Sequence, residues 1–473
     1  MRQRKQNTSR RSFLPPASCL LLTVLFLLLT ASAGAQTTPP ATPPTAAPDF
    51  QGVIARQAAL VTEFEINGLK VLVKRREGSQ TVAAGLFIRG GVENISSSNA
   101  GVEAFMLNVA SEASANFPRD RMRKETSRMG TGISESVTYD YSVLSMVATR
   151  SNFDRSWEIF TDVALRPSFT KEDAALVQAR LLAGLQGEAD EPDGYLQRLQ
   201  DRVAYVGHPY LNRPEGTAEN VSRLTAEDLR AYHQKIMQTS RLLLVIVGDL
   251  DAGQLKTRIA AAFGKLPRGD YKPQAPPALS FTSSTVDVTS RELKTNYIQG
   301  MFSAPSLTSP DIYPMRVASS LLRDRVFEEV RVKRNLSYAP DAFLRNQSAN
   351  VGGLYVTADK DSANPAVRVM LNEVARLQRQ PISPDDINSV VAQFLTTYYI
   401  GQQTNAAQAG ELAQYELIGG GWRNSLVFLE KLRAVTPADV QRVSQKYMRN
   451  IRFVVLGNPQ QIDKTVFTGP AGG

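Results

Sequence analysis

The segment TAEDLRAYHQKIMQTSR at residues 225–241 gives the main indication of the fold, because a related segment, TPADVQRVSQKYMRNIR, occurs again at residues 436–452. The two copies are 211 residues apart and carry the same residue at six of 17 positions. Each begins with Thr and has Asp three residues later, a variant of the capping box that starts a helix. Each is followed by an apolar run that ends in glycine, at 242–248 and 453–457. A period this long, without a shorter repeat, predicts two sibling domains.

The upstream parts of both halves follow the same plan. Alternating or continuous apolar runs predict strands at 69–74, 82–89, 142–148, 297–303 and 353–358. Helical periodicity predicts helices at 101–115, 152–165, 170–187, 312–334, 365–377 and 383–399. Because the strands are mostly of hairpin type, we expect an α+β fold of two sibling domains. Each would be a mainly antiparallel sheet with helices packed on one face.

Composition divides the chain into further segments. A Pro-rich stretch separates the halves, with prolines at 267, 273, 276 and 277, and another precedes the first half. The expected parts are a signal peptide (1–35), a Pro/Thr-rich tether (36–50), a first domain (51–265), a linker (266–285), a second domain (286–465) and a tail (466–473).

The first 35 residues have the three parts of an export signal: a basic start, an apolar run and a small-residue stretch. The apolar run at 19–31 is too short to cross a hydrocarbon core of about 30 Å. We expect cleavage after Ala35, with Ala33 as the second choice. Residues 9–14 (SRRSFL) resemble a twin-arginine signal, and the alternative is an ordinary secretory signal with paired arginines. The mature protein is therefore expected to be periplasmic or secreted, with no membrane span.

The charge and the cysteine content exclude several classes of protein. Five of the positive charges lie before residue 12, and without them the net charge falls from +9 to +4. That is too weak to predict nucleic-acid binding, which needs a dense basic stripe. The only cysteine, Cys19, lies in the expected signal, so the body has no disulfide and no thiolate site. With 42% apolar and 21% charged residues, the body can bury large cores.

Several short motifs, in order and spacing, resemble the pitrilysin/insulinase family of zinc peptidases, in its shorter bacterial and mitochondrial-processing-peptidase-like branch. The resemblance covers about residues 55 to 465. It implies pairs of like α+β domains that enclose a chamber, and an edge strand near 134–145 on which extended peptides lie. The motifs are Gly90-Gly91-Val92-Glu93, the helix start at 101–108, Gly207-His208-Pro209-Tyr210, Val247-Gly248-Asp249 and the segment 330–338.

The family's zinc motif is absent. Active members carry His-x-x-Glu-His on the helix after the glycine motif, and a Glu from a later helix completes the ligand set. Histidines four residues apart share a helical face and bind one Zn²⁺, while the Glu serves as general base. The corresponding residues here are Ala104, Leu107, Asn108 and, on the later helix, Gly184. Since none of these can bind zinc or take a proton from water, we predict no metal and no catalytic residue in this chain.

A relocated metal site has few candidate ligands. Glu103 and Glu112 share the predicted helix with the lost motif, but a catalytic zinc site usually includes histidine. The two histidines, His208 and His233, are 25 residues apart and cannot share a helical turn. We expect His208 to be structural, His233 to be a surface or packing residue, and Glu103 to be an ordinary charge on the helix surface.

Active relatives also use an Arg and a Tyr from the second domain to bind the peptide, and this pair matches Arg331 and Tyr338. We expect Arg331 at a helix end and Tyr338 on the strand that follows, with Asn335 in the left-handed turn between them. The alternative is structural: Arg331 would pair with a nearby Glu, and Tyr338 would fill the edge of a core.

The resemblance therefore predicts an exported, non-catalytic subunit that pairs with a zinc-bearing sister chain. It would lend Arg331 and Tyr338 to a shared chamber that binds a peptide or an unfolded protein. Zinc is expected in the partner and no cofactor in this chain. The alternative is a structural or peptide-binding protein without a peptidase partner, like the core subunits of respiratory complexes.

Overall fold

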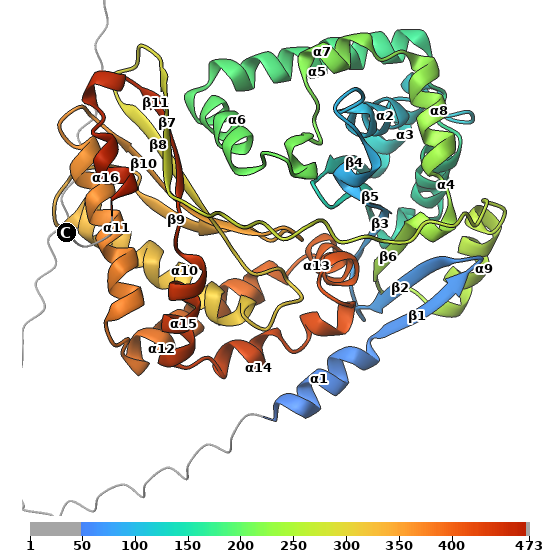
Figure 1. Cartoon of the computed structure of the whole chain (residues 1–473). Coiled ribbons are helices and arrows are strands. Elements are labelled where there is room, and N and C mark those ends of the chain that lie inside the picture. The colour runs from blue at the N-terminus through green and yellow to red at the C-terminus, as the bar shows by residue number, and fades with distance from the viewer. Residues whose placement is uncertain (1–48, 470–473) are drawn as a thin grey trace, which may run out of the picture. The chain divides into compact units, whose positions relative to one another are not determined.

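The computed structural model describes residues 49–469, and Figure 1 shows how their helices and strands are arranged. The expected signal peptide, most of the expected tether (36–48) and residues 470–473 of the expected tail lie outside the described residues. Within 49–469 the chain forms two β-sheets that pack against helices, which confirms the α+β class. No helix in this range has both the length and the apolarity that a membrane span requires.

The first sheet has the strand order β1-β2-β6-β3-β5-β4. β2 and β6 are parallel, and the other neighbours are antiparallel. Every residue of β6 is buried, as expected for a central strand covered on both faces. The strands are β1 (Val61–Ile66), β2 (Leu69–Arg75), β3 (Thr81–Arg89), β4 (Gly132–Val137), β5 (Tyr141–Thr149) and β6 (Leu242–Gly248).

The second sheet repeats this topology without a counterpart of β1. Its order is β7-β11-β8-β10-β9, again with one parallel pair, β7 with β11. The strand that follows each repeated helix, β6 or β11, lies between the parallel and the antiparallel part of its sheet. The repeat at 225–241 and 436–452 therefore marks a real structural duplication. The strands are β7 (Thr285–Ser290), β8 (Asn296–Ser303), β9 (Asp341–Leu344), β10 (Val351–Ala358) and β11 (Arg452–Gly457).

The helices of the two halves follow the same order along the chain. In the first half they are α1 (Phe50–Ala59), α2 (Val102–Ala110), α3 (Arg119–Met129), α4 (Phe153–Leu165), α5 (Lys171–Asp190), α6 (Pro192–Ala204), α7 (Ala218–Arg223), α8 (Ala226–Ile236) and α9 (Ala252–Phe263). In the second half they are α10 (Ile312–Val326), α11 (Ala363–Arg379), α12 (Pro384–Gly401), α13 (Asn405–Ile418), α14 (Phe428–Arg433), α15 (Pro437–Tyr447) and α16 (Lys464–Thr468). A π-helical turn, η5 (Phe327–Val332), extends α10.

Each half covers one face of its own sheet with its own helices, as predicted. The opposite face meets a helix from the other half, an arrangement that the prediction did not include (Figure 1). In the first sheet, Leu72, Phe87 and Val245 pack against Leu412 and Ala413 of α13. In the second sheet, Val454 and Leu456 of β11 pack against Leu196 of α6. Because α6 and α13 hold the same place in the order of their halves, the exchange is reciprocal.

Some predicted boundaries were wrong. The predicted helix 101–115 ends at Ala110, because the chain then turns and Ser114 forms a bridge with Pro167. The predicted helix 312–334 divides into α10 and the π-helical turn η5. Part of the expected tail lies in α16, whose Phe467 is buried with its ring centroid 5.2 Å from that of Phe453.

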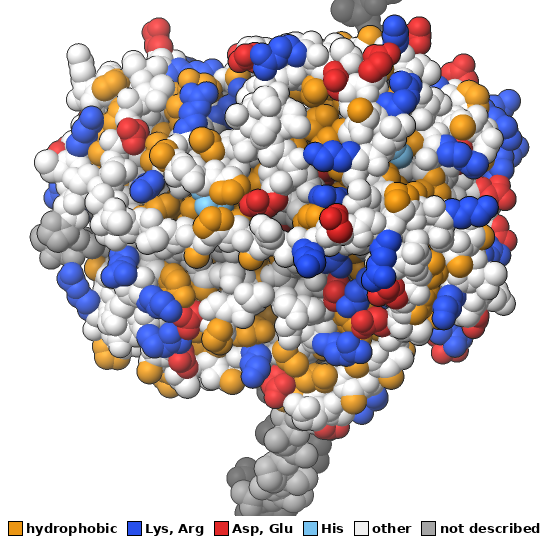
Figure 2. Space-filling view, turned by 45° about the vertical axis from the view of Figure 1, so that its right-hand side comes forward, with side chains coloured by type: hydrophobic (Ala, Val, Ile, Leu, Met, Phe, Trp, Pro, Cys, Tyr) orange, Lys and Arg blue, Asp and Glu red, His pale blue; other side chains and the backbone are white. Residues whose placement is uncertain are grey.

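The surface charge agrees with the weak net charge of the sequence. Figure 2 shows one face of the molecule, on which basic and acidic side chains are interspersed and form no continuous basic stripe.

Candidate functional site

The positions that the resemblance assigns to the metal lie on α2 and α5. Ala104 and Leu107 are buried, and the Asn108 side-chain amide donates a 3.0 Å hydrogen bond to the carbonyl oxygen of Ala104. Gly184, on α5, has open space where a Cβ would stand. A methyl, an isobutyl group, an amide and a hydrogen do not form a zinc-ligand set. The residues present therefore do not fit a metal ion.

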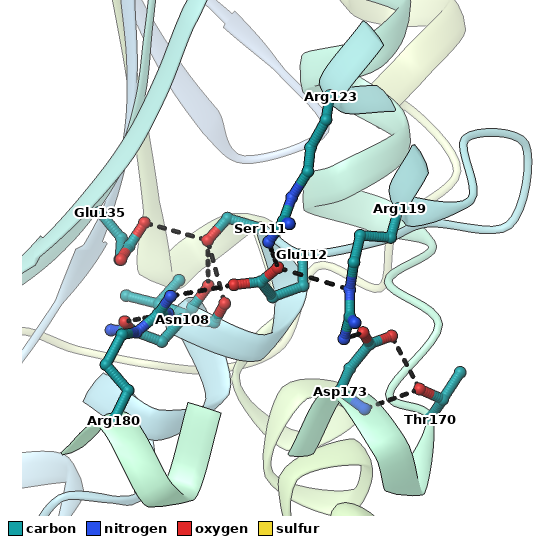
Figure 3. A network of polar contacts seen from close by, with 10 residues as sticks. Asn108, Ser111, Glu112, Arg119, Arg123, Glu135, Thr170, Asp173 and Arg180 are labelled. Carbon is teal, nitrogen blue, oxygen red and sulfur yellow. Dashed lines mark hydrogen bonds and ion pairs between the residues drawn. The ribbon is translucent and has the colours of Figure 1, made fainter. Parts of the chain in front are cut away.

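A guanidinium group lies beside these positions instead (Figure 3). Arg180, one helical turn before Gly184, donates to the side-chain oxygen of Asn108 at 3.3 Å and to Glu112 Oε1 at 3.1 Å. Arg123 donates to Glu112 Oε2 at 2.7 Å. A cation held at this place adds an electrostatic penalty for any divalent ion that would bind next to it.

The same network joins three helices. Arg119, at the start of α3, lies 3.6 Å from Glu112, just beyond the end of α2, and forms an ion pair with Asp173 of α5. Asp173 is buried, and its backbone N–H is capped at 3.0 Å by the hydroxyl of Thr170. Glu112 is therefore shared among Arg119, Arg123 and Arg180, and the cluster ties α2, α3 and α5 together around the former site.

The edge of the first sheet borders this cluster. β4 is the outermost strand, as expected for the region near 134–145, and its other side is not paired with a strand in the described range. Glu135, on β4, accepts a 3.0 Å hydrogen bond at its Oε2 from the hydroxyl of Ser111. Ser111 lies one helical turn beyond Asn108. Burial raises the pKa of Glu135 from its ordinary value.

The expectation that Glu103 is a surface charge was wrong. Its side chain is buried, and it accepts hydrogen bonds from the Tyr232 hydroxyl at 2.6 Å and from Asn94 at 3.4 Å. Burial raises the pKa of Glu103, and hydrogen bonds from Ser142, Tyr232 and Asn94 partly oppose that shift. The available signal was its position as the only charged residue in the apolar run 102–107.

Both histidines have structural partners. His208 Nδ1 accepts from the backbone N–H of Tyr210 at 3.1 Å, and its Nε2 lies 2.9 Å from the carbonyl oxygen of Pro277. His233 Nε2 lies 2.9 Å from the carbonyl oxygen of Ala164, and burial lowers the pKa of His233. In residues 49–469, no three side chains of His, Cys, Asp or Glu cluster in a way that could hold a metal ion.

The structure brings Arg331 and Tyr338 into contact. The Arg331 guanidinium carbon lies 4.1 Å from the centroid of the Tyr338 ring and 5.1 Å from that of Phe327. Tyr338 is 79% exposed and Phe327 is 42% exposed. No carboxylate of the described residues forms an ion pair with Arg331. The structural alternative placed a Glu beside Arg331 and Tyr338 at the edge of a core; among the described residues no Glu forms an ion pair with Arg331, and Tyr338 is exposed.

The local backbone agrees with the prediction in part. Arg331 lies in the π-helical turn at the end of α10, and Asn335 adopts the expected left-handed conformation with φ of 50°. Tyr338 does not lie on a strand, because β9 begins three residues later at Asp341. In the described range, no hydrogen bond, ion pair or ring contact links Arg331 or Tyr338 to the α2 positions. No direct contact among the described residues therefore joins the two predicted sites.

Comparison with known proteins identifies the family. Residues 70–201 match the model described as Insulinase (Peptidase family M16), and residues 223–394 match the model described as Peptidase M16 inactive domain. The chain is 23% identical over 412 residues to the beta subunit of the mitochondrial-processing peptidase of Blastocladiella emersonii. That alignment covers 83% of this chain and 87% of that protein. The chain is also 25% identical over 261 residues to cytochrome b-c1 complex subunit 1 of Bos taurus, covering 54% of each.

Solved structures share the fold. A protease from Helicobacter pylori superposes with a TM-score of 0.77 at 16% identity, covering 84% of this chain and 99% of that chain. A peptidase M16 inactive domain from Pseudomonas fluorescens gives a TM-score of 0.76 at 17% identity, covering 84% and 98%. With its duplicated sheets and with family models that match both halves, the chain belongs to peptidase family M16, the insulinase family, and carries an M16 inactive-type domain.

Proposed function

We propose that this protein is an exported, non-catalytic subunit of an M16-type metallopeptidase. It pairs with a zinc-bearing sister chain and contributes Arg331 and Tyr338 to the binding of a peptide or an unfolded protein. The observation that carries the proposal is the state of these two side chains. The two side chains are stacked and exposed to solvent, and no carboxylate of the described residues pairs with Arg331. In contrast, the residues at the metal positions of the same chain cannot bind a metal ion.

The chemistry of the pair suits a peptide. A guanidinium group that is not neutralised by a carboxylate donates charge-assisted hydrogen bonds to a peptide carbonyl, each worth about 1.5–3 kcal/mol. The Tyr338 ring packs against the guanidinium group, and the Arg331 side chain remains partly exposed. The edge strand β4 offers a second surface, where an extended chain adds backbone hydrogen bonds to the sheet.

The need for a partner follows from what the chain lacks. Ala104, Leu107, Asn108 and Gly184 provide no metal ligand and no general base, so hydrolysis requires a second chain that does. Two relatives are named as subunits, one of a processing peptidase and one of a cytochrome complex. The N-terminal signal-like segment supports export of the chain, by either the twin-arginine or the general secretory route.

The test is a reconstitution with an M16 protein that carries His-x-x-Glu-His and is encoded next to this chain. We expect peptidase activity only when the two purified proteins are mixed, and a fall of at least tenfold with Arg331→Ala. The matched control is Arg334→Ala, because Arg334 lies on the same segment but forms an ion pair with Glu329. Arg334→Ala should leave activity unchanged, and both variants should still form the complex.

A complex whose activity does not respond to Arg331→Ala would refute the shared site. It would favour the alternative, a structural or peptide-binding protein without a peptidase role. The observation on that side is the similarity to cytochrome b-c1 complex subunit 1. Cleavage by this chain alone would contradict both proposals.

A further inference from the structure

The second half contains a cavity of about 190 Å³ that none of the residues discussed above lines. It lies between α10 and α12 and is also lined by Leu344, the last residue of β9, and by Asn346 just after it. Basic and hydroxyl side chains of α10 form one wall, and α12 contributes one apolar side chain, Phe394, between two polar ones, Gln393 and Thr397. Its main lining residues are Arg316, Ser319, Arg323, Leu344, Asn346 and Phe394.

Arg316 is a partly buried cation without an acidic partner. Its Nη2 donates to Asn346 Oδ1 at 2.8 Å, and its guanidinium lies 5.2 Å from the Phe428 ring centroid. Within the described part of the chain, no carboxylate forms an ion pair with it, and its Nε is buried without a hydrogen-bond acceptor. Glu411, whose carboxylate interacts electrostatically with Arg316, is half-buried and accepts a hydrogen bond from Gln402 at 2.6 Å. Burying a charged group in this way costs free energy unless a nearby opposite charge compensates it.

Ser319 supplies a second donor at the same place. It is only 6% exposed, and its hydroxyl has no hydrogen-bond partner. Most buried hydroxyl groups in proteins are hydrogen-bonded, and within a helix a serine can bond to the carbonyl oxygen one turn earlier. The unsatisfied hydroxyl of Ser319 and the unsatisfied Nε of Arg316 belong to residues that line one cavity. Two donors without acceptors indicate that the cavity is shaped for a ligand with acceptor oxygens.

The charge of the cavity selects the ligand. Arg323 is neutralised by Asp341, whose Oδ1 lies 3.0 Å from its Nε, and it also donates to the carbonyl oxygen of Ala342. This leaves Arg316 as the cation of the cavity that forms no ion pair with a described carboxylate, and a single positive charge matches a monoanion better than a phosphate dianion. The planar guanidinium fork matches a carboxylate, and Leu344 and Phe394 can pack on an aliphatic stem.

We propose that this cavity binds a carboxylate group carried on a short aliphatic stem, with Arg316 and Ser319 as the donors. Two sources supply that chemistry: a free small organic acid, or the side chain of an acidic residue in a bound peptide. The peptide source rests on the proposed function, since α10 continues directly into the turn that carries Arg331. The free-acid source is independent of it.

Butyrate is the probe, with butyramide as its uncharged isostere and inorganic phosphate as the competing anion, all at equal ionic strength. Calorimetric titration of the purified protein should show one butyrate site and no butyramide binding. Arg316→Gln should weaken butyrate binding at least about tenfold, and Ser319→Ala should weaken it measurably. The matched controls are Arg368→Gln on α11 and Ser389→Ala on α12. Both residues are exposed and lie outside the cavity, so both variants should bind like the parent.

Thermal unfolding without ligand controls for folding. Ser319→Ala should not lower the melting temperature, because the hydroxyl it removes has no partner. The proposal is refuted if butyrate does not bind, if butyramide or phosphate binds as well as butyrate, or if Arg316→Gln and Arg368→Gln bind alike. A second experiment distinguishes the two sources of the carboxylate, by comparing a labelled peptide that contains one Glu with the same peptide carrying Gln. If the protein binds the Glu peptide more tightly and butyrate abolishes this difference, the ligand is a peptide. If the two peptides bind equally, the ligand is a free acid. Neither result depends on the mixed-chain peptidase assay.

Discussion

At the scale of single residues, Asp311 shows how one carboxylate fixes two helices. It stands just before α10 and accepts hydrogen bonds from Arg442 at 2.7 Å, Lys446 at 2.8 Å and Tyr447 at 2.9 Å, all on α15. Burial works against its ionisation, but the hydrogen bonds from Lys446, Arg442 and Tyr447 outweigh it and lower the pKa of Asp311 to about 2. The ionised form is therefore bound more strongly in the folded state.

This shift predicts a pH-dependent loss of stability. Because the folded pKa lies below the unfolded value of about 3.9, the contribution is complete above about pH 5 and is lost as the pH falls through about 2. Asp311→Asn should lower the free energy of unfolding by about 2 kcal/mol at pH 7, and the difference from the parent should shrink below about pH 4 and vanish near about pH 1. Urea titrations at several pH values measure this. Asp287→Asn, at an exposed position on β7, is the control and should have little effect at any pH.

The absence of zinc ligands also gives a prediction for individual residues. Ala104, Asn108 and Gly184 provide no metal ligand set, and Arg180 donates to Asn108. Elemental analysis of the purified chain should find far less than one zinc ion per polypeptide, and a chelator should not change its thermal unfolding. One tightly bound zinc per chain, lost with a fall in melting temperature, would contradict this interpretation of the site.

At the scale of elements, the two repeated helices have matching N-terminal caps. The Thr225 hydroxyl accepts from the backbone N–H of Asp228 at 3.2 Å, and Asp228 accepts in return from the N–H of Thr225 at 2.9 Å. Thr436 and Asp439 repeat both bonds, each at 3.2 Å. The capping boxes predicted from sequence are thus confirmed in both halves.

The two caps should make similar contributions to stability. Thr225→Ala and Thr436→Ala should each lower the free energy of unfolding by about 1 kcal/mol, because each leaves helix N–H groups without an acceptor. Denaturant titration measures the two values. The control is Thr396→Ala, an exposed position inside α12, where alanine has the higher helix propensity and should not destabilise the protein. A cost confined to one of the two caps would show that the repeats are not energetically equivalent.

At the scale of the whole molecule, the exchange of α6 and α13 links the two halves. Trp422, just after α13, is buried, and its Nε1 donates to Glu63 of β1 at 2.8 Å. Without α13, the face of the first sheet that contains Leu72, Phe87 and Val245 would be open to water. Such a patch favours aggregation over a folded monomer.

We therefore expect that neither half folds alone. Residues 49–265, produced separately, should aggregate or unfold without a cooperative transition, and co-production with residues 266–469 should restore a soluble complex. Calorimetry of the fragment and of the complex measures this. In the intact chain, Leu412→Ala should lower the free energy of unfolding by about 2–5 kcal/mol, the usual cost of a cavity at a buried leucine. A cooperative, monomeric first half would contradict the expectation.

The sequence by itself determined the local and repeated features: the duplicated helix–strand unit, both capping boxes, the missing zinc ligands and the left-handed Asn335. These depend on hydrophobic period, cap chemistry and residue type, all of which act over a few neighbouring positions. The tertiary structure alone decided which faces meet. It buried Glu103 against Tyr232, brought Arg180 to Asn108 and placed α13 on the sheet of the other half. An apolar stripe shows that a face will be covered, but the covering element lies far along the chain, and only packing selects it.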